Sequence, residues 1–231
     1  MNTLALVFAI WAAGSLQPAR DPLAAVRQMV ADAREEIEAF EKSNPSAGSQ
    51  HPAVKWDNAL WAIHEREPRT DAGARAAVEA VRLLTQAEMW PRADARVESL
   101  TLDDPAWEGL PWVLYEAGIK RKELPAVITT LSRVAEAAPK PTTKAAALMI
   151  IGRAYRRQGD LAAATRSLEA SRSAAPASSY AEESKGIIYE IEHLSPGQPA
   201  PAISSTARNG RAFSLADMRG KPAVLVFWGT T

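Results

Sequence analysis

The chain has 231 residues, 47% of them hydrophobic, which is enough for one large domain or two small ones around a packed core. Lysine plus arginine and aspartate plus glutamate number 27 each, and the resulting net charge of zero argues against general electrostatic binding of nucleic acid or anionic membrane. There is no cysteine, which excludes disulfides, thiolate nucleophiles and cysteine-based zinc sites within these residues.

Residues 1–20 are predicted to be a signal peptide. The apolar run over residues 4–14 is far shorter than the ~20 residues of a membrane-spanning helix, and small residues precede Ser15 at a passable cleavage site. We therefore expect a periplasmic or secreted protein, without a lipid anchor because there is no cysteine to carry one. The alternative is an ordinary buried first helix, since only the α-amino group is charged before Leu4.

Residues 21–194 are predicted to form an all-α domain, because apolar residues recur at helical spacing through almost the whole segment. Asp21 before Pro22 is a typical helix start, and this first helix continues to Phe40. Residues 43–49 (SNPSAGS) are typical of a loop. Further helices are predicted at 54–67, 72–90 and 92–100, then one capped by residues 103–105 and running past Trp107 and Tyr115, then two more pairs ending near Leu194.

A repeat is visible in the second half of this segment. Its first helix carries Leu148, Ile151, Gly152 and Tyr155, and after a turn at 158–160 its second carries Ala164, Leu168 and Ser171, with Pro176 at the close. This pattern resembles the tetratricopeptide repeat, although that family usually has an aromatic residue at the position of Leu168 and alanine at that of Ser171. Because Gly152 and Ala164 are small, we expect the tightest packing of the helical region between them. The preceding segment echoes the pattern 37 residues earlier, close to the ~34 of such repeats, in Leu114, Leu124, Leu131 and Pro139.

The composition changes at Ser195. Residues 195–201 (SPGQPAP) are too rich in proline and glycine for a helix. A hairpin is predicted from Ile203 to Phe213, because Asn209-Gly210 readily supplies the positive φ angles of its turn. A short helical turn follows at 214–218, and the continuous apolar run over 223–228 is typical of a buried central strand.

Five submotifs in this last segment occur in a family order: GQPAP at 197–201, NGR at 209–211, FSL at 213–215, RGKP at 219–222 and VLVFWGT at 224–230. They resemble the entry of TlpA-like thiol-disulfide oxidoreductases, which belong to the thioredoxin-like superfamily with the alkyl hydroperoxide reductase/thiol-specific antioxidant (AhpC/TSA) proteins. That family has G-x-P-A-P-D-F, a D-G hairpin, S-L-x-D-x-R-G-K and a strand ending in F-W-A-T-W. Here Ala202 and Ile203 replace Asp-Phe, Gly229 replaces alanine and Thr231 replaces tryptophan.

The resemblance implies a redoxin whose catalytic half is missing. In the family a Cys-x-x-Cys motif follows this strand at once, so the first redox cysteine would come directly after Thr231. The fold we expect is therefore mainly α: a TPR-like antiparallel helical array over 21–194, then over 195–231 the first β-hairpin and first central strand of an incomplete thioredoxin-like α/β domain. An intact relative would exchange a dithiol with disulfides in client proteins, or reduce peroxides.

A second hypothesis is a TPR-like adaptor whose concave helical face binds a peptide or protein; the sequence that follows Thr231 in the gene discriminates between the two. Unpaired, the strand over 223–228 would be an exposed edge with a tendency to aggregate. In neither case do we expect a nucleic-acid partner, a cofactor or a bound metal.

No residue is assigned a catalytic, cofactor-binding or metal-binding role. His51, His64 and His193 are scattered without the spacing of a metal site, and the acidic run at 35–38 is typical of a solvated helix face. The basic residues at 120–122, 153 and 156–157 are expected on solvated helix faces or ends. Five tryptophans are expected mainly in the core or between helices: Trp56, Trp61, Trp90, Trp107 and Trp112.

Overall fold

The structure is a computed structural model that describes residues 21–43, 51–206, 208–220, 222–224 and 226. Over these residues the protein is mainly helical with one small antiparallel sheet, as the sequence predicts. The elements are α1 (Pro22–Ser43), α2 (Pro52–Arg66), α3 (Asp71–Gln86), α4 (Trp90–Ser99), η3 (Pro105–Glu108), α5 (Leu110–Arg121), α6 (Leu124–Ala137), α7 (Pro141–Gln158), α8 (Leu161–Ala174), α9 (Ser179–His193), β1 (Ser204–Thr206), β2 (Ala212–Ser214) and η4 (Leu215–Met218). The predicted signal peptide and most of the loop at 43–49 lie outside the described residues.

The helices begin where local sequence favours it. Proline occupies the first turn of α2, α4, α5, α6 and α7, where its missing N–H is not needed. Polar side chains cap others: the Thr70 hydroxyl accepts the Gly73 N–H at 3.0 Å, and the Asp160 carboxylate accepts that of Ala163 at 2.9 Å. Helix α7 ends at Gly159, whose φ of 85° suits glycine, so the predicted turn at 158–160 is confirmed.

Two predicted helices are divided in the structure. The helix predicted over 72–90 is wrong at its end, because α3 stops at Gln86, Glu88 adopts a φ of 57° and α4 starts at Trp90. Pro91 explains the break, because in a continuous helix its ring would clash with the carbonyl group of residue 87 and one intrahelical hydrogen bond would be lost, whereas in the first turn of α4 neither occurs. The helix predicted past Trp107 is split as well: Asp104 caps the short η3, and α5 begins only at Leu110.

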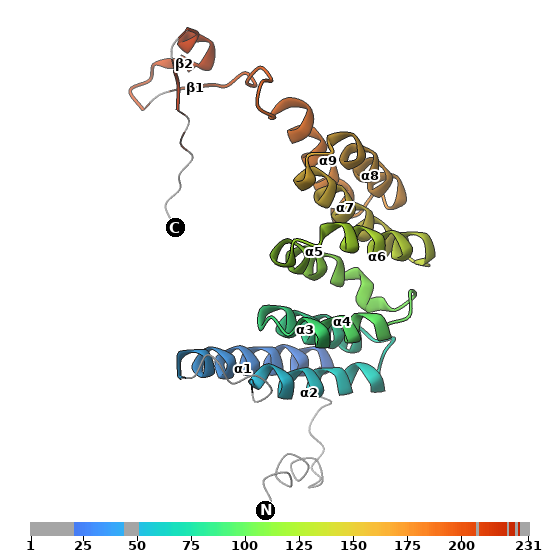
Figure 1. The fold of residues 1–231 in the computed structure, drawn as a ribbon. Coiled ribbons are helices and arrows are strands. Elements are labelled where there is room, and N and C mark those ends of the chain that lie inside the picture. The colour runs from blue at the N-terminus through green and yellow to red at the C-terminus, as the bar shows by residue number, and fades with distance from the viewer. Residues whose placement is uncertain (1–20, 44–50, 207, 221, 225, 227–231) are drawn as a thin grey trace, which may run out of the picture.

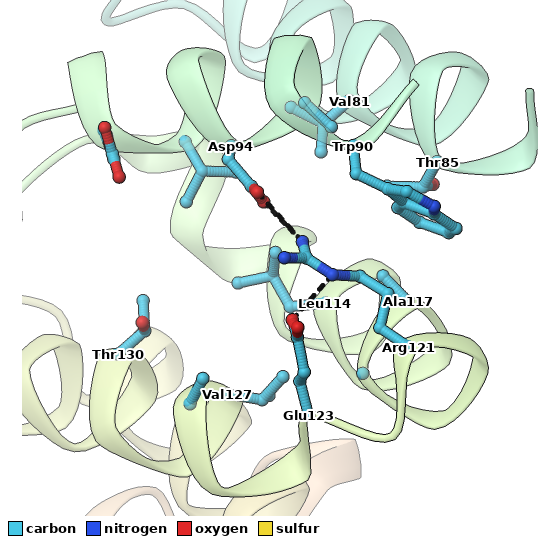
Figure 2. A pocket seen from close by; sticks show the side chains of 15 residues that line it. Val81, Thr85, Trp90, Asp94, Leu114, Ala117, Arg121, Glu123, Val127 and Thr130 are labelled. Atoms are coloured by element: carbon cyan, nitrogen blue, oxygen red, sulfur yellow. Dashed lines mark hydrogen bonds and ion pairs between the residues drawn. The ribbon is translucent and has the colours of Figure 1, made fainter. Parts of the chain in front are cut away.

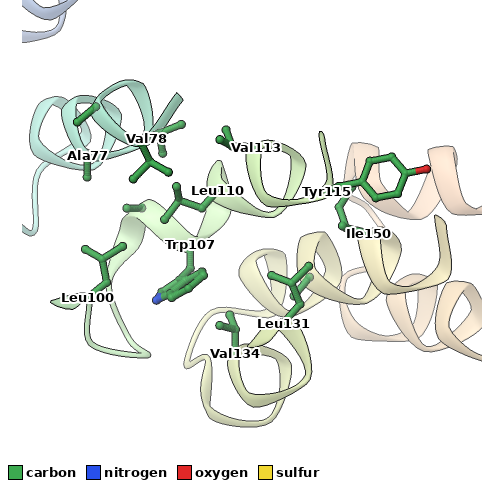
Figure 3. Packing of buried hydrophobic residues seen from close by; sticks show 14 of the residues in the cluster. Ala77, Val78, Leu100, Trp107, Leu110, Val113, Tyr115, Leu131, Val134 and Ile150 are labelled. Atoms are coloured by element: carbon green, nitrogen blue, oxygen red, sulfur yellow. The ribbon is translucent and has the colours of Figure 1, made fainter. Parts of the chain in front are cut away.

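The nine helices of the described residues stack into an elongated array that starts with α1 and α2 and ends with α8 and α9 (Figure 1). The segment between α4 and α5 joins the first four helices to the last five. Leu100 and Trp107 of this segment, with Leu110 at the start of α5, lie between Val78 of α3 and Leu131 of α6 (Figure 3). Trp107 is buried and its indole N–H donates to the Thr101 carbonyl oxygen at 2.9 Å, so a large apolar ring is held there without an unpaired polar atom.

The expected close packing of α7 on α8 is present. A Cβ added to Gly152 would lie 2.6 Å from Cγ of Leu168 and 3.2 Å from the Ala164 carbonyl oxygen. This is not the tightest point of the helical region, however. A Cβ on Gly118 would lie equally close, 2.6 Å, to Cγ2 of Val127, and one on Gly73 would be 2.0 Å from the Glu67 carbonyl oxygen in the α2–α3 turn. Close approach of consecutive helices therefore recurs along the array.

Residues related by the 37-residue offset of the predicted repeat have similar positions in the structure in part of the segment. Leu131 of α6 and Leu168 of α8 are both fully buried, and the left-handed residues that end α5 and α7, Lys122 and Gly159, are also 37 residues apart. The match breaks at the helix starts, where Leu124 is buried but Leu161 is exposed. Residues 37 positions apart thus have the same burial in the middle of the second helix of each pair, but different burial at its first residue.

The hairpin predicted after Ser195 is confirmed. Strands β1 and β2 pair antiparallel with Ser205 opposite Phe213, and Gly210 in the turn has a φ of 78°. The hairpin lies beyond the end of α9, apart from the array (Figure 1). No described residue from 195 onward is buried.

The predicted central strand does not form in its described part. Residues 223, 224 and 226 are not in a strand, and Val224 and Val226 are 88% and 73% exposed. The described sheet offers only β1 and β2, which pair with each other, so the apolar run has no strand to join. The rest of this run lies outside the described residues. Among the described helices, none combines the length and apolarity that crossing a bilayer requires.

Candidate functional site: a groove between α4 and α6

The candidate site is a groove of about 250 Å³ at the junction of the two halves of the array. Helices α4 and α6 form its two walls and α3 and α5 its floor (Figure 2). It exists because α3 packs directly on α5 whereas the side chains of α4 and α6 face one another across an open space. The apolar side chains of its lining are those of Val81, Trp90, Ala93, Val97, Leu114, Ala117, Ala126 and Val127.

Arg121, in the last turn of α5, reaches into the groove from the floor (Figure 2). Its Nη1 donates to Asp94 of α4 at 2.7 and 3.0 Å, and its Nε lies 2.6 Å from Glu123 at the start of α6. The guanidinium is 5.6 Å from the centre of the Trp90 ring, within range of a cation–π interaction. One arginine thus ties both walls of the groove to its floor.

The hydrogen bond to Asp94 is the main reason that the pKa of Arg121 is raised above its ordinary value, while partial burial acts in the opposite direction. Asp94, Glu98 and Glu123 give the lining three carboxylates against the single cation of Arg121. The lining therefore combines apolar side chains with an excess of carboxylates.

The uncharged polar groups of the lining are few. The hydroxyls in the lining belong to Thr85, which donates to the Arg82 carbonyl oxygen at 2.8 Å, and to Thr130. No histidine lies in the lining to act as a base toward either hydroxyl. Across the described residues, no group of three or more histidine, aspartate or glutamate side chains is placed to hold a metal ion.

The histidines do not meet in the structure. His64 is the buried one: its Nε2 lies 3.5 Å from Asp104, which caps η3, and its ring packs 4.9 Å from that of Trp61. It therefore links α2 to the segment that joins the two halves. His51 accepts the Ala53 N–H at the start of α2, and His193 is exposed at the end of α9.

The tryptophans follow the prediction with one exception. Trp61 and Trp107 are buried, and Trp56 and Trp90 are partly buried. Trp112 of α5 is 39% exposed and lies under the guanidinium of Arg153 of α7, 5.2 Å from it.

Of the basic residues predicted on solvated helix faces or ends, Lys120, Lys122, Arg156 and Arg157 are exposed as expected, but two of the set from α7 also make contacts between helices. Arg153 pairs with Glu183, and Arg156 lies 2.7 Å from Glu190, so α7 is tied to α9 twice. Arg121 was expected among the same solvated charges, yet it is the centre of the groove. Local sequence could not show this, because Asp94 lies 27 residues away in the chain.

Two buried acids were missed by sequence reasoning. Asp57 of α2 is fully buried and pairs with Arg92 at 2.6 Å and Arg96 at 2.9 Å, both from α4. Glu79 of α3 is fully buried too. A signal was present: Asp57 shares the apolar face of α2 with Leu60 and Trp61, where a solvated acid is not expected.

Fold and site together define a helical array with a groove suited to docking and a separate β-hairpin. Comparison of the chain with protein-family models, with curated proteins and with solved structures finds no match.

Proposed function

We propose that the chain is the N-terminal part of an exported TlpA-like thiol-disulfide oxidoreductase, with a TPR-like array over 21–194 followed by the start of a thioredoxin-like domain over 195–231. The observation that carries the proposal is the order of elements after Ser195. An antiparallel hairpin with its turn at Asn209-Gly210 runs directly into a helical turn, η4, where Ser214 and Asp217 form a reciprocal capping box. These elements coincide with the submotifs that resemble the oxidoreductase entry.

The exposure of the following apolar run supports the same proposal. Side chains such as Val224 and Val226 are strongly favoured inside a sheet covered on both faces, and here both are exposed. A thioredoxin-like domain would pair and cover them. For the helical part, the close approach of Gly152 to Leu168 and the burial of Leu131 and Leu168 one repeat apart support a TPR-like arrangement.

The chemistry of such a protein would be dithiol exchange with client proteins or, as a lesser candidate, peroxide reduction. The attacking species in either reaction is a thiolate, and the 231 residues contain no cysteine. We therefore expect these residues alone to leave insulin disulfides intact in the presence of dithiothreitol and to consume no peroxide.

The gene beyond codon 231 tests the proposal. We expect Cys at the next position and a second Cys three residues later, at the start of a helix whose dipole lowers the pKa of the first thiol. The longer protein should reduce insulin, and Cys→Ser at the first position should abolish that activity. A longer reading frame without this cysteine would refute the oxidoreductase proposal.

Export has a test of its own. We propose that the signal peptide is cleaved near Ser15 on export, which would place the mature protein in the periplasm or outside the cell. The intact mass of protein recovered from a secreting host should lack the first ~14 residues. Protein that keeps Met1 and stays in the cytoplasm would refute export.

A helical adaptor is the second candidate, and the groove between α4 and α6 is the observation that favours it. A photo-crosslinking residue at Thr130, inside the groove, should give a discrete adduct with a binding partner, whereas the same group at the exposed Arg157 should not. Ala126→Trp should fill the groove and abolish the adduct. Equal labelling from both positions would refute a docking role for the groove.

A further inference from the structure

Three arginines converge on one buried carboxylate at the contact between α1 and α3. Glu79 of α3 is fully buried. Its oxygens lie 2.8 Å from Arg75, one turn earlier in α3, 3.4 Å from Arg82, one turn later, and 3.7 Å from Arg34 of α1. We refer to Arg34, Arg75 and Arg82 as the arginine cluster.

The arginine cluster has more positive charge than its surroundings neutralise. Among the described residues, Glu79 is the only carboxylate within 4.0 Å of any of these three guanidinium groups. One carboxylate against three guanidinium groups leaves a formal surplus of two positive charges. The Nε of Arg82 is buried against Glu79, so the N–H groups open to a further anion are the outer ones of Arg34 and Arg75. The cluster therefore has both charge and N–H donors to offer to a further anion.

The free edges of the cluster are accessible. The side chains of Arg34 and Arg75 are 59% and 51% exposed, so their outer N–H groups reach solvent while Glu79 holds the inner ones. Arg27 is exposed on the same face of α1, two turns before Arg34. A guanidinium presents a planar fork of donors that matches the two oxygens of a carboxylate.

The neighbouring charges decide which anion fits. Helix α1 also carries Glu35, Glu36, Glu38 and Glu41 close to Arg34 along the chain. These acids would repel a polyanion such as nucleic acid, whose charges extend well beyond the cluster. A ligand with one or two carboxylates meets the arginines without extending along the acidic part of α1.

We propose that the arginine cluster is a docking site for an acidic segment of a partner protein, whose aspartate or glutamate side chain bridges Arg34 and Arg75. Glu79 then neutralises one of the three positive charges from the buried side, and the ligand neutralises the surplus. The site is separate from the groove between α4 and α6, and the inference stands independently of the function proposed above.

The test measures binding of a fluorescein-labelled peptide with two carboxylates, Gly-Gly-Asp-Glu-Gly-Gly with an amidated C-terminus, to the full chain by fluorescence anisotropy. The matched control peptide has Asn and Gln in place of Asp and Glu. We expect the acidic peptide to bind at least tenfold more tightly, with an affinity that falls as salt is raised. Arg34→Gln together with Arg75→Gln should remove about tenfold of that affinity, and Arg133→Gln, an exposed arginine on α6, should leave it within twofold.

Two further measurements keep the result decisive. Glu79→Gln removes the competing carboxylate and should tighten binding of the acidic peptide severalfold, whereas a purely structural ion-pair cluster would change only in stability. The single variants Arg34→Gln and Arg75→Gln, checked by circular dichroism, replace the double variant if it does not fold. Equal binding of both peptides, unchanged affinity in the arginine variants, or full competition by a DNA duplex at equal charge concentration would overturn the proposal.

Discussion

Gly152→Ala adds a methyl group at the contact between α7 and α8. The new Cβ would lie 2.6 Å from Cγ and 2.8 Å from Cδ2 of Leu168, whereas carbon atoms normally approach to about 3.5–4.0 Å. Leu168 is fully buried and the Ala164 carbonyl oxygen lies 3.2 Å away, so neither neighbour can turn toward solvent. The two helices have to separate by roughly 1 Å to restore ordinary carbon–carbon contact.

Two effects oppose each other in this variant. Overpacking a well-filled core costs about 1–3 kcal/mol, and replacing glycine by alanine inside a helix returns about 1 kcal/mol. We expect a net loss of about 1 kcal/mol. Gly186 of α9 is the matched control, because a Cβ there would meet no atom within 4 Å. Gly186→Ala should therefore stabilise the protein by about 0.5–1 kcal/mol.

Urea unfolding of the full chain, followed by the helical circular dichroism signal, measures both changes. At an unchanged slope, the midpoint should fall for Gly152→Ala and rise for Gly186→Ala. A midpoint that rises for both, or that does not move for Gly152→Ala, would show that α7 and α8 are not in close contact here. Ala164→Leu adds more volume at the same contact and should cost about 1–3 kcal/mol.

Three further outcomes are expected. Asp57→Ala should lower the free energy of unfolding in urea by about 3 kcal/mol, because Arg92 and Arg96 of α4 lose the buried carboxylate with which they pair. A loss below 0.5 kcal/mol would contradict a stabilising role of these ion pairs. The pKa of Glu36 is lowered, mainly by its hydrogen bond from Lys55, so its contribution to stability is present at neutral pH and is lost as the pH falls through the folded-state pKa. In Glu36→Gln the melting temperature, measured from pH 7 to pH 3, should therefore fall less steeply with decreasing pH than in the unaltered protein. A chain ending at Ser195 should keep its helical signal and cooperative melt and be more soluble than all 231 residues, because it lacks the exposed apolar run; loss of the melt would mean that the tail packs on the array.

Helix positions were well predicted by the sequence because they depend on local interactions. The start at Pro22, the turn at Gly159 and the end near Leu194 follow from apolar spacing, caps, proline and glycine, which act within a few residues. The hairpin turn at Asn209-Gly210 was predictable for the same reason. Where local signals competed, as around Glu88, the predicted helix ran on too long.

The groove and the arginine cluster could not be predicted from local sequence. Asp94 and Arg121 are 27 residues apart, and Arg34 meets Glu79 from another helix, so these pairs exist only once the helices have stacked. The apolar run at Val224 also depends on tertiary contacts: its composition favours a central strand, but a strand forms only where neighbouring strands can pair with it. Sequence by itself determined which segments are helical and where the hairpin turns, since those interactions are short in range. Only the tertiary structure decided which charges are buried, which helices leave a groove between them and which apolar residues stay exposed.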